Sequence, residues 1–144
     1  MSMSSRITPE ELARRLCDAT NAHDLDGIVA CFAADYRNET PVHPARGFSG
    51  REQVLRNWEQ IFTFVPDLRA ELLGCATNGH TVWTEWEHSG TRPDGSTHRM
   101  RGVIIFDVSD GLMSAARFYL EPVDAGEIDV DAAVRRQVNP AAAR

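Results

Sequence analysis

The sequence predicts a single α+β domain, in which three helices pack against one curved, mostly antiparallel sheet and close around a small apolar pocket. Before the sheet region, apolar residues occur at helical spacing within the first 65 residues. From Leu68 to Glu121 the chain instead alternates apolar and polar residues. Three turn signals, Asn78-Gly79, Pro93-Asp94-Gly95 and Ser109-Asp110-Gly111, divide that region into strands joined by hairpins.

The first two helices are predicted from their capping residues. Thr8 and Glu11 have the spacing of a capping box, and Pro9 suits the first position of a helix. Asp24 is an acidic residue just before a second apolar stretch, so we expect it to cap a short second helix.

A strand, a loop and a third helix are expected next. Asp35–Thr40 alternates polar and apolar residues and predicts a short strand, while Pro41–Gly50 contains two prolines and two glycines and predicts a loop. Ser49 and Glu52 have the spacing of a second capping box, so we expect a third helix to begin there. Pro66 ends it.

The long hairpin has a predicted register. Pro93-Asp94-Gly95 suits a three-residue loop, which places Arg92 opposite Ser96 and therefore Trp86 opposite Gly102. The same register places His88 on the same face as Trp86.

The loop length of the last hairpin is predicted from which residues it places opposite one another. A two-residue Asp110-Gly111 loop would set the apolar Ile104 opposite the charged Arg117. We therefore expect a three-residue loop, which places Gly102 opposite Phe118.

One face of the predicted sheet is charged. Opposite charges stand across from one another there, which is typical of an outer charge ladder; the alternative is a carboxylate-arginine catalytic cluster. This face carries Glu85, Glu87, Arg99, Arg101, Arg117, Tyr119 and Glu121.

The other face is apolar and predicts the pocket. Gly102, in the middle of a strand, is expected to leave a hollow between the rings of Trp86 and Phe118. The alternative is that Trp86 fills that space. We expect the pocket to be lined by Trp86, Phe118, Met100, Gly102, Trp58, Phe62, His43 and Ile104.

Composition excludes several classes of function. The net charge of -6, with arginines interleaved among glutamates, argues against binding nucleic acid. The chain has no lysine, which excludes Schiff-base chemistry on a lysine, and no apolar run approaches the about 20 residues of a membrane helix. Its histidines show no metal-binding spacing, and no phosphate loop occurs, so no metal or cofactor is expected.

The cysteine content predicts the redox state of the protein, and the pattern along the chain predicts the bounds of its domain. Three is an odd number at no metal-like spacing, so we expect reduced thiols in a cytoplasmic protein. Residues 1–123 are expected to form the domain, and 124–144 a tail that is partly helical, over Asp131–Val138, or disordered.

Several motifs resemble a known family. Asn21-Ala-His-Asp-Leu-Asp26, Cys31-Phe-Ala-Ala-Asp-Tyr-Arg-Asn38, Gly47-Phe-Ser-Gly-Arg-Glu52 and Asp110-Gly111 with Ala116-Arg-Phe-Tyr119 resemble the SnoaL-like branch of the nuclear transport factor two-like superfamily. The resemblance implies a cone-shaped fold with its pocket at the wide end, and a homodimer through the outer sheet face. This fold hosts polyketide cyclases, isomerases, epoxide hydrolases, dehydratases and binding modules.

The resemblance also allows a residue-by-residue comparison. Tyr36 and Asn38 look like the pair that positions water in limonene epoxide hydrolases, but the places of their arginine and two aspartates fall on Trp86, His88 and Phe118. In ketosteroid isomerases the position matching Thr40 carries a carboxylate base, and the one matching Ile104 an acidic hydrogen-bond donor. The chain therefore keeps the pocket and lacks the familiar carboxylates.

The catalytic candidates are His88, Tyr36 and Asn38. We expect burial to lower the pKa of His88 and keep the ring neutral, so that it can remove a proton next to a carbonyl while Tyr36 or Asn38 donates to the oxyanion. The alternative is a structural histidine. His43 is expected on the rim of the pocket or as a solvated loop residue.

Three functions are compatible with these features. The first is a cofactor-independent cyclase, isomerase or hydratase that acts on a small, mostly apolar carbonyl compound. The second is a non-catalytic domain that binds or senses an apolar metabolite. The third is a dimerisation module whose cone is filled by its own side chains.

Overall fold

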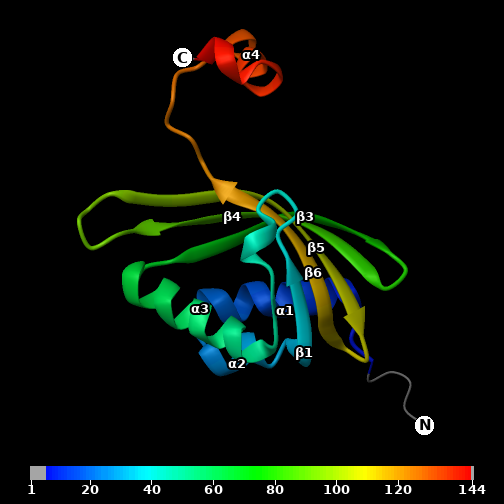
Figure 1. Ribbon diagram of the computed structural model, residues 1–144. Helices are drawn as coiled ribbons and strands as arrows, with labels where there is room; N and C mark the ends of the chain where they lie inside the picture. Colours follow the sequence, from blue (N-terminus) through cyan, green and yellow to red (C-terminus); the bar gives the residue numbers. More distant parts are fainter. Residues whose placement is uncertain (1–5, 144) are drawn as a thin grey trace.

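Three helices lie against one face of a curved sheet in the computed structural model, which describes residues 6–143 (Figure 1). The helices are α1 (Pro9–Asn21), α2 (Leu25–Val29) and α3 (Arg51–Phe64). The strands are β1 (Phe32–Glu39), β2 (Phe48–Ser49), β3 (Arg69–Asn78), β4 (Thr81–Thr91), β5 (Thr97–Ser109) and β6 (Leu112–Pro122). Within the described residues they form one six-stranded sheet of order β2-β1-β6-β5-β4-β3, antiparallel except where β1 runs parallel to β6. The predicted α+β class is confirmed.

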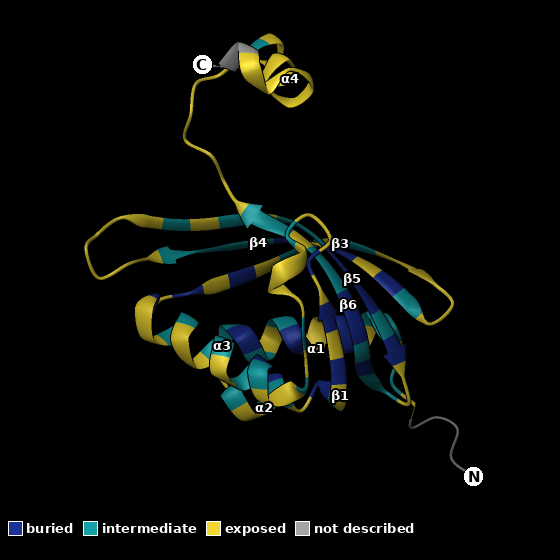
Figure 2. Ribbon diagram, viewed as in Figure 1, coloured by how far each residue is buried: buried dark blue, intermediate teal, exposed yellow. Residues whose placement is uncertain are grey.

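The core lies between the helices and the concave face of the sheet. Figure 2 shows buried residues along α1 and along the strands that face it, with exposed residues on the outer sides of the helices. Leu12, Ile28, Phe106 and Met113 are at most 1% exposed. Burial of apolar area on this scale is the main term that stabilises a domain of this size.

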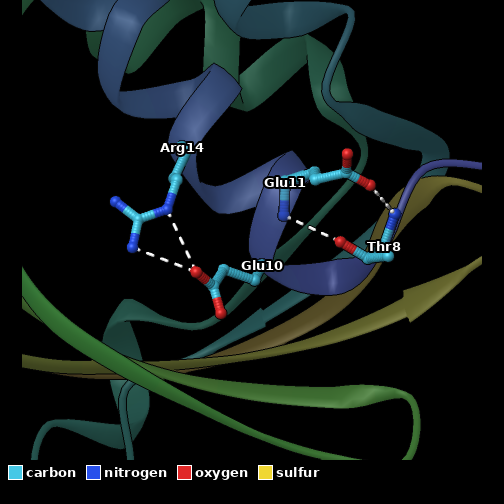
Figure 3. Close-up of polar contacts among 4 residues, drawn as sticks. All are labelled: Thr8, Glu10, Glu11 and Arg14. Atoms are coloured by element: carbon cyan, nitrogen blue, oxygen red, sulfur yellow. Dashed lines mark hydrogen bonds and ion pairs between the residues drawn. The ribbon is translucent and has the colours of Figure 1, made fainter.

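The capping box of α1 forms as predicted (Figure 3). The Thr8 hydroxyl accepts a hydrogen bond from the Glu11 amide at 3.1 Å, and the Glu11 carboxylate accepts one from the Thr8 amide at 2.9 Å. An exposed ion pair of 3.0 Å joins Glu10 to Arg14 one turn later. Asp24 caps α2 through its side chain, also as predicted.

The predicted capping box of α3 is wrong. Ser49 belongs to β2, where it pairs with Arg37, so its side chain is not at the helix start. Gly50 is the residue before the helix instead, with a φ of 95° that favours glycine, and its amide donates to the carbonyl of Tyr36 at 2.7 Å. The strand pairing therefore replaces the side-chain cap.

The register of the β4–β5 hairpin is as predicted. The Arg92 amide donates to the Ser96 carbonyl at 2.9 Å across the Pro-Asp-Gly turn. Trp86 is opposite Gly102, and His88 is opposite Met100.

The register of the β5–β6 hairpin differs from the prediction by two residues. Ser109 pairs with Leu112, so the turn has two residues rather than three. Ser114 is then an unpaired bulge residue, whose hydroxyl donates to the Asp107 carbonyl at 3.1 Å. Because the bulge adds one residue to β6, the side chains keep the predicted faces, but Gly102 lies opposite Leu120 and not Phe118.

Gly102 is not a vacancy. A Cβ atom at this position would overlap the Tyr119 carbonyl oxygen and would lie 2.9 Å from the Leu120 Cα atom. Its φ is 150°, which a residue with a side chain rarely adopts. The close approach of the β6 backbone therefore requires a glycine here. The prediction that the missing side chain of Gly102 leaves a hollow between Trp86 and Phe118 is wrong.

The tail after β6 stands away from the sheet and the helices (Figures 1 and 2). It contains α4 (Val130–Val138) and the 3-10 turn η3 (Pro140–Ala143), and Asp129 caps α4 by accepting from the Ala132 amide at 3.0 Å. No residue of α4 is buried. The helix agrees with the expected stretch, while residue 144 of the expected tail lies outside the described residues. No helix within residues 6–143 is long and apolar enough to cross a membrane.

Candidate functional site

A cavity of about 390 Å³ lies between the concave sheet face, α1, α3 and β1. Most of its wall is apolar and aromatic. Of the eight residues predicted to line it, the structure places five on its wall: Trp58, Trp86, Met100, Ile104 and Phe118. Its polar side chains are Thr20, Tyr36, Asn38, Thr40, Arg46, Asn57, His88 and His98.

The other three predicted lining residues lie elsewhere. Gly102 is covered by the backbone of β6, as described above. The Phe62 ring stacks on the His23 ring, with centroids 4.3 Å apart, and so faces α1 and α2 rather than the cavity. His43 is outside the wall, where its Nε2 atom lies 3.2 Å from a carboxylate oxygen of Glu121.

Trp86 forms an apolar wall whose polar atom is already satisfied. The side chain is buried, and its Nε1–H donates to the Thr84 hydroxyl at 2.7 Å. That hydroxyl donates in turn to the Ile104 carbonyl at 2.5 Å. Trp86 therefore offers a ligand an aromatic surface and no free hydrogen-bond donor.

Tyr36 and Asn38 act as a pair on β1, where their spacing of two residues places both side chains on the inner face. The Tyr36 hydroxyl donates to the Asn38 Oδ1 atom at 2.8 Å. Burial raises the pKa of Tyr36 far above its usual value, so the phenol stays protonated. Since its one proton is used on Asn38, the amide group of Asn38 is the better donor toward the cavity, with no described partner for its Nδ2 atom.

His88 lies between two indole rings. Its ring centroid is 5.9 Å from that of Trp58 and 5.8 Å from that of Trp86. Burial lowers the pKa of His88 to about 4, and the nearby His98 adds to that effect. The imidazole is therefore neutral near pH 7, and no described residue hydrogen-bonds to its nitrogens.

Five polar lining residues were not predicted from the sequence: Thr20, Thr40, Arg46, Asn57 and His98. His98 could have been found, because it lies two residues before Met100 on the same strand and shares its face. Arg46 could not, because it belongs to the short 3-10 turn η2 (Pro44–Arg46) in a segment without periodicity.

The charged outer face is separate from the cavity except at Glu121, whose carboxylate lies 3.9 Å from Arg46 on the cavity wall. Glu87 lies 3.1 Å from Arg99 and 3.5 Å from Arg101, and both arginine side chains are about half exposed. None of these three side chains lines the cavity, and Glu85 and Arg117 do not line it either. The geometry fits an outer charge ladder better than a catalytic cluster.

Comparison with known proteins identifies the fold. A family model described as a SnoaL-like domain matches residues 13–116. A solved structure of wild-type IdmH from Streptomyces antibioticus, a proposed polyketide cyclase, matches with a TM-score of 0.69 at 22% identity, covering 79% of this chain and 92% of that one.

Two other solved structures have the same fold. A proposed ketosteroid isomerase from Kribbella flavida matches with a TM-score of 0.63 at 25% identity, covering 82% of this chain and 79% of that one. A nuclear transport factor two-like protein of unknown function from Cytophaga hutchinsonii matches with a TM-score of 0.63 at 13% identity, covering 83% of this chain and 95% of that one. No curated protein matches the chain at a significant level.

Proposed function

The chain belongs to the SnoaL-like domain family, and on this premise we propose that its cavity binds a small, mostly apolar carbonyl compound and acts on it without a cofactor. The fold is related to those of polyketide cyclases and ketosteroid isomerases. The observation that carries the proposal is one apolar cavity whose wall holds both a neutral imidazole, His88, and an amide donor, Asn38.

The proposed reaction is a proton transfer next to the carbonyl group. A ring nitrogen of His88 takes a proton from the carbon beside the carbonyl, and the electron pair of that C–H bond forms the enolate double bond. The carbonyl π pair moves to the oxygen, to which the Asn38 amide donates. If the compound has a C=C bond next to the reacting carbon, the imidazolium returns its proton to the far carbon of the conjugated dienolate, which moves the double bond and isomerises the compound. If the compound carries a second carbonyl group, the enolate carbon attacks that carbonyl carbon, its C=O π pair moves to its oxygen, and the imidazolium protonates that oxygen, which closes a ring. Tyr36 is a positioning residue, because it holds the Asn38 amide.

A non-catalytic binding domain is the second candidate, and one observation favours it. An imidazole whose pKa is about 4 is a weak base, since the protein stabilises its protonated form poorly. Proton removal from carbon requires that this form become stable when the ligand is bound. A binder needs only the cavity and the Asn38 donor.

The experiment measures binding and proton abstraction separately. Quenching of tryptophan fluorescence by 2-tetralone reports binding, because Trp58 and Trp86 line the cavity. Exchange of its α-protons in D₂O, followed by NMR, reports proton removal even where no product accumulates. We expect the native protein to accelerate exchange and His88→Gln to reduce that acceleration at least about tenfold, with binding retained. His80→Gln, in the exposed turn after β3, is the matched control.

The outcomes separate the functions. Binding with no accelerated exchange, and no product by mass spectrometry from a panel of related ketones, identifies the non-catalytic binder. Loss of exchange in His88→Gln together with a lowered melting temperature assigns His88 a structural role. Absence of binding by every ketone at millimolar concentration contradicts the proposal and leaves the dimerisation module.

A further inference from the structure

Arg46 is the one side chain with a permanent charge on the described wall of the cavity. The other ionisable groups there are Tyr36, His88 and His98. Burial keeps Tyr36 protonated and favours the neutral form of both histidines. The lining therefore carries one positive charge and no carboxylate, although the whole chain has a net charge of -6.

The backbone holds Arg46 at the mouth of the cavity. The His43 amide donates to the Thr40 carbonyl at 2.8 Å, and the Arg46 amide donates to the His43 carbonyl at 2.9 Å. These bonds fold the segment after β1 into the turn η2. The guanidinium is thus carried by an ordered turn that joins two strands of the sheet.

The guanidinium has most of its donors free. Its Nη1 atom lies 3.9 Å from a carboxylate oxygen of Glu121, at the outer limit of an ion pair, and no described residue accepts a hydrogen bond from it. His43 lies closer to that carboxylate, at 3.2 Å. The Arg46 side chain is 61% exposed, so its planar set of N–H donors remains accessible to an acceptor that enters the mouth.

Arg46 and Asn38 lie on the same wall. The residue after Arg46, Gly47, packs on the Asn38 carbonyl, because a Cβ atom there would lie 3.2 Å from that oxygen. The next residue, Phe48, pairs with Asn38 across β1 and β2. A ligand that meets the Asn38 amide with one oxygen therefore has a second polar contact available toward the mouth.

We infer that the ligand of this cavity carries a single carboxylate, which Arg46 binds at the mouth while the apolar part of the ligand enters between Trp86 and Phe118. A guanidinium matches a carboxylate in a bidentate, charge-assisted pair. A dianionic group such as a phosphate fits poorly, because Arg46 is the only permanently charged group among the described lining residues and Glu121 beside it repels each added negative charge. This inference rests on the proposed binding function and specifies its substrate class.

The experiment compares a carboxylate with its neutral isostere. Dissociation constants for 2-naphthoic acid and 2-naphthamide are measured by tryptophan quenching and by calorimetry at pH 7. We expect the native protein to bind the acid about tenfold more tightly, because a charge-assisted pair contributes on that scale. Arg46→Met should weaken binding of the acid to the level of the amide and leave binding of the amide unchanged.

A matched control removes the same charge from the opposite side of the wall. Arg37 precedes Asn38 on β1 and is exposed on the outer face, away from the cavity. Arg37→Met should keep the preference for the acid. If Arg37→Met removes the preference as fully as Arg46→Met does, the effect is one of net charge and the inference is overturned.

Two further results distinguish failure of the carboxylate inference from failure of the proposed binding function. Equal affinity of the native protein for acid and amide overturns the carboxylate inference and leaves the proposed binding function standing. No binding of either probe or of any ketone overturns both. Circular dichroism of Arg46→Met should show a native fold, since the side chain is largely exposed on a turn.

Discussion

At the scale of single residues, Gly102 and His88 affect the stability of the fold in two different ways. Gly102 allows β6 to approach β5 closely, and His88 brings a titratable ring among indole side chains. Each has a consequence for stability that can be measured without knowing the ligand.

Replacement of Gly102 by alanine should be strongly destabilising. The new Cβ atom would meet backbone atoms of Tyr119 and Leu120, which cannot move aside as a flexible side chain would, and the φ of 150° disfavours alanine. We expect Gly102→Ala to lower the free energy of unfolding by about 3 kcal/mol or more in urea denaturation. Gly74→Ala is the control: no atom lies within 4 Å of a Cβ there, so we expect a change below about 1 kcal/mol. Equal effects at both positions would contradict the crowding argument.

His88 should make the protein less stable as the pH falls. Its pKa is about 4 in the folded chain against an ordinary value of 6.5, so between these values the unfolded chain binds a proton that the folded chain does not. The contribution is fully present above pH 6.5 and is lost as the pH falls toward 4, by an amount on the order of 3 kcal/mol. His98, whose pKa burial also lowers, acts in the same direction.

The measurement is urea denaturation between pH 4 and 7. His88→Phe should flatten the slope over this range, while His80→Phe, in an exposed turn, serves as the control for loss of an imidazole. An unchanged slope in His88→Phe would show that His88 is not the group responsible.

At the scale of secondary-structure elements, β6 and α4 show two different relations between sequence and fold. In β6 the two-residue turn alone would turn the apolar side chains of the strand toward the outer face. The extra residue of the bulge, Ser114, shifts the register by one, so the apolar side chains face the helices. In α4 the helix forms from its own capping signal, and no residue of it is buried. A helix of nine residues gains little stability on its own.

Removal of the tail should leave the domain intact. Val123 still donates to the Arg99 carbonyl at 2.9 Å, so the last bond of the sheet precedes α4. We expect a chain ending at Asp124 to unfold within about 0.5 kcal/mol of the full chain. For comparison, Leu12→Ala in the core should cost about 2 to 5 kcal/mol. A tail deletion as costly as Leu12→Ala would show that α4 packs on the body of the protein.

At the scale of the whole molecule, the outer sheet face is the surface most suited to a second copy of the chain. Trp83 is 50% exposed and Tyr119 is 38% exposed on this face, among charges of both signs. A two-fold interface buries the same surface on both copies, and a surface that carries charges of both signs can be complementary to itself. We propose a homodimer through this face.

Sedimentation equilibrium tests the dimer. We expect a dimer at micromolar concentration, and Trp83→Glu should raise the dissociation constant at least about tenfold, because buried aromatic anchors dominate such interfaces. Phe64→Glu is the control, since Phe64 is 60% exposed at the end of α3 on the other side of the sheet. A native monomer at these concentrations would contradict the dimer.

Much of the fold could be inferred from signals only a few residues long. The Thr8 capping box, the Pro-Asp-Gly turn with its register, and the alternation that separates the two sheet faces all depend on neighbours along the chain. Motifs of this kind were also enough to indicate the family. Such interactions form within a turn or a hairpin, so their residue types suffice to predict them.

The cavity depends on contacts between distant segments and was only partly predictable. Gly102 is crowded by Tyr119, Phe62 is drawn to His23, and Arg46 reaches the cavity mouth beside Glu121. Each of these contacts joins residues on different elements, and each depends on a bulge, a turn or a helix position that no short motif encodes. The amino-acid pattern therefore predicts which face is apolar, whereas the packing of the elements establishes where space remains and which charge borders it.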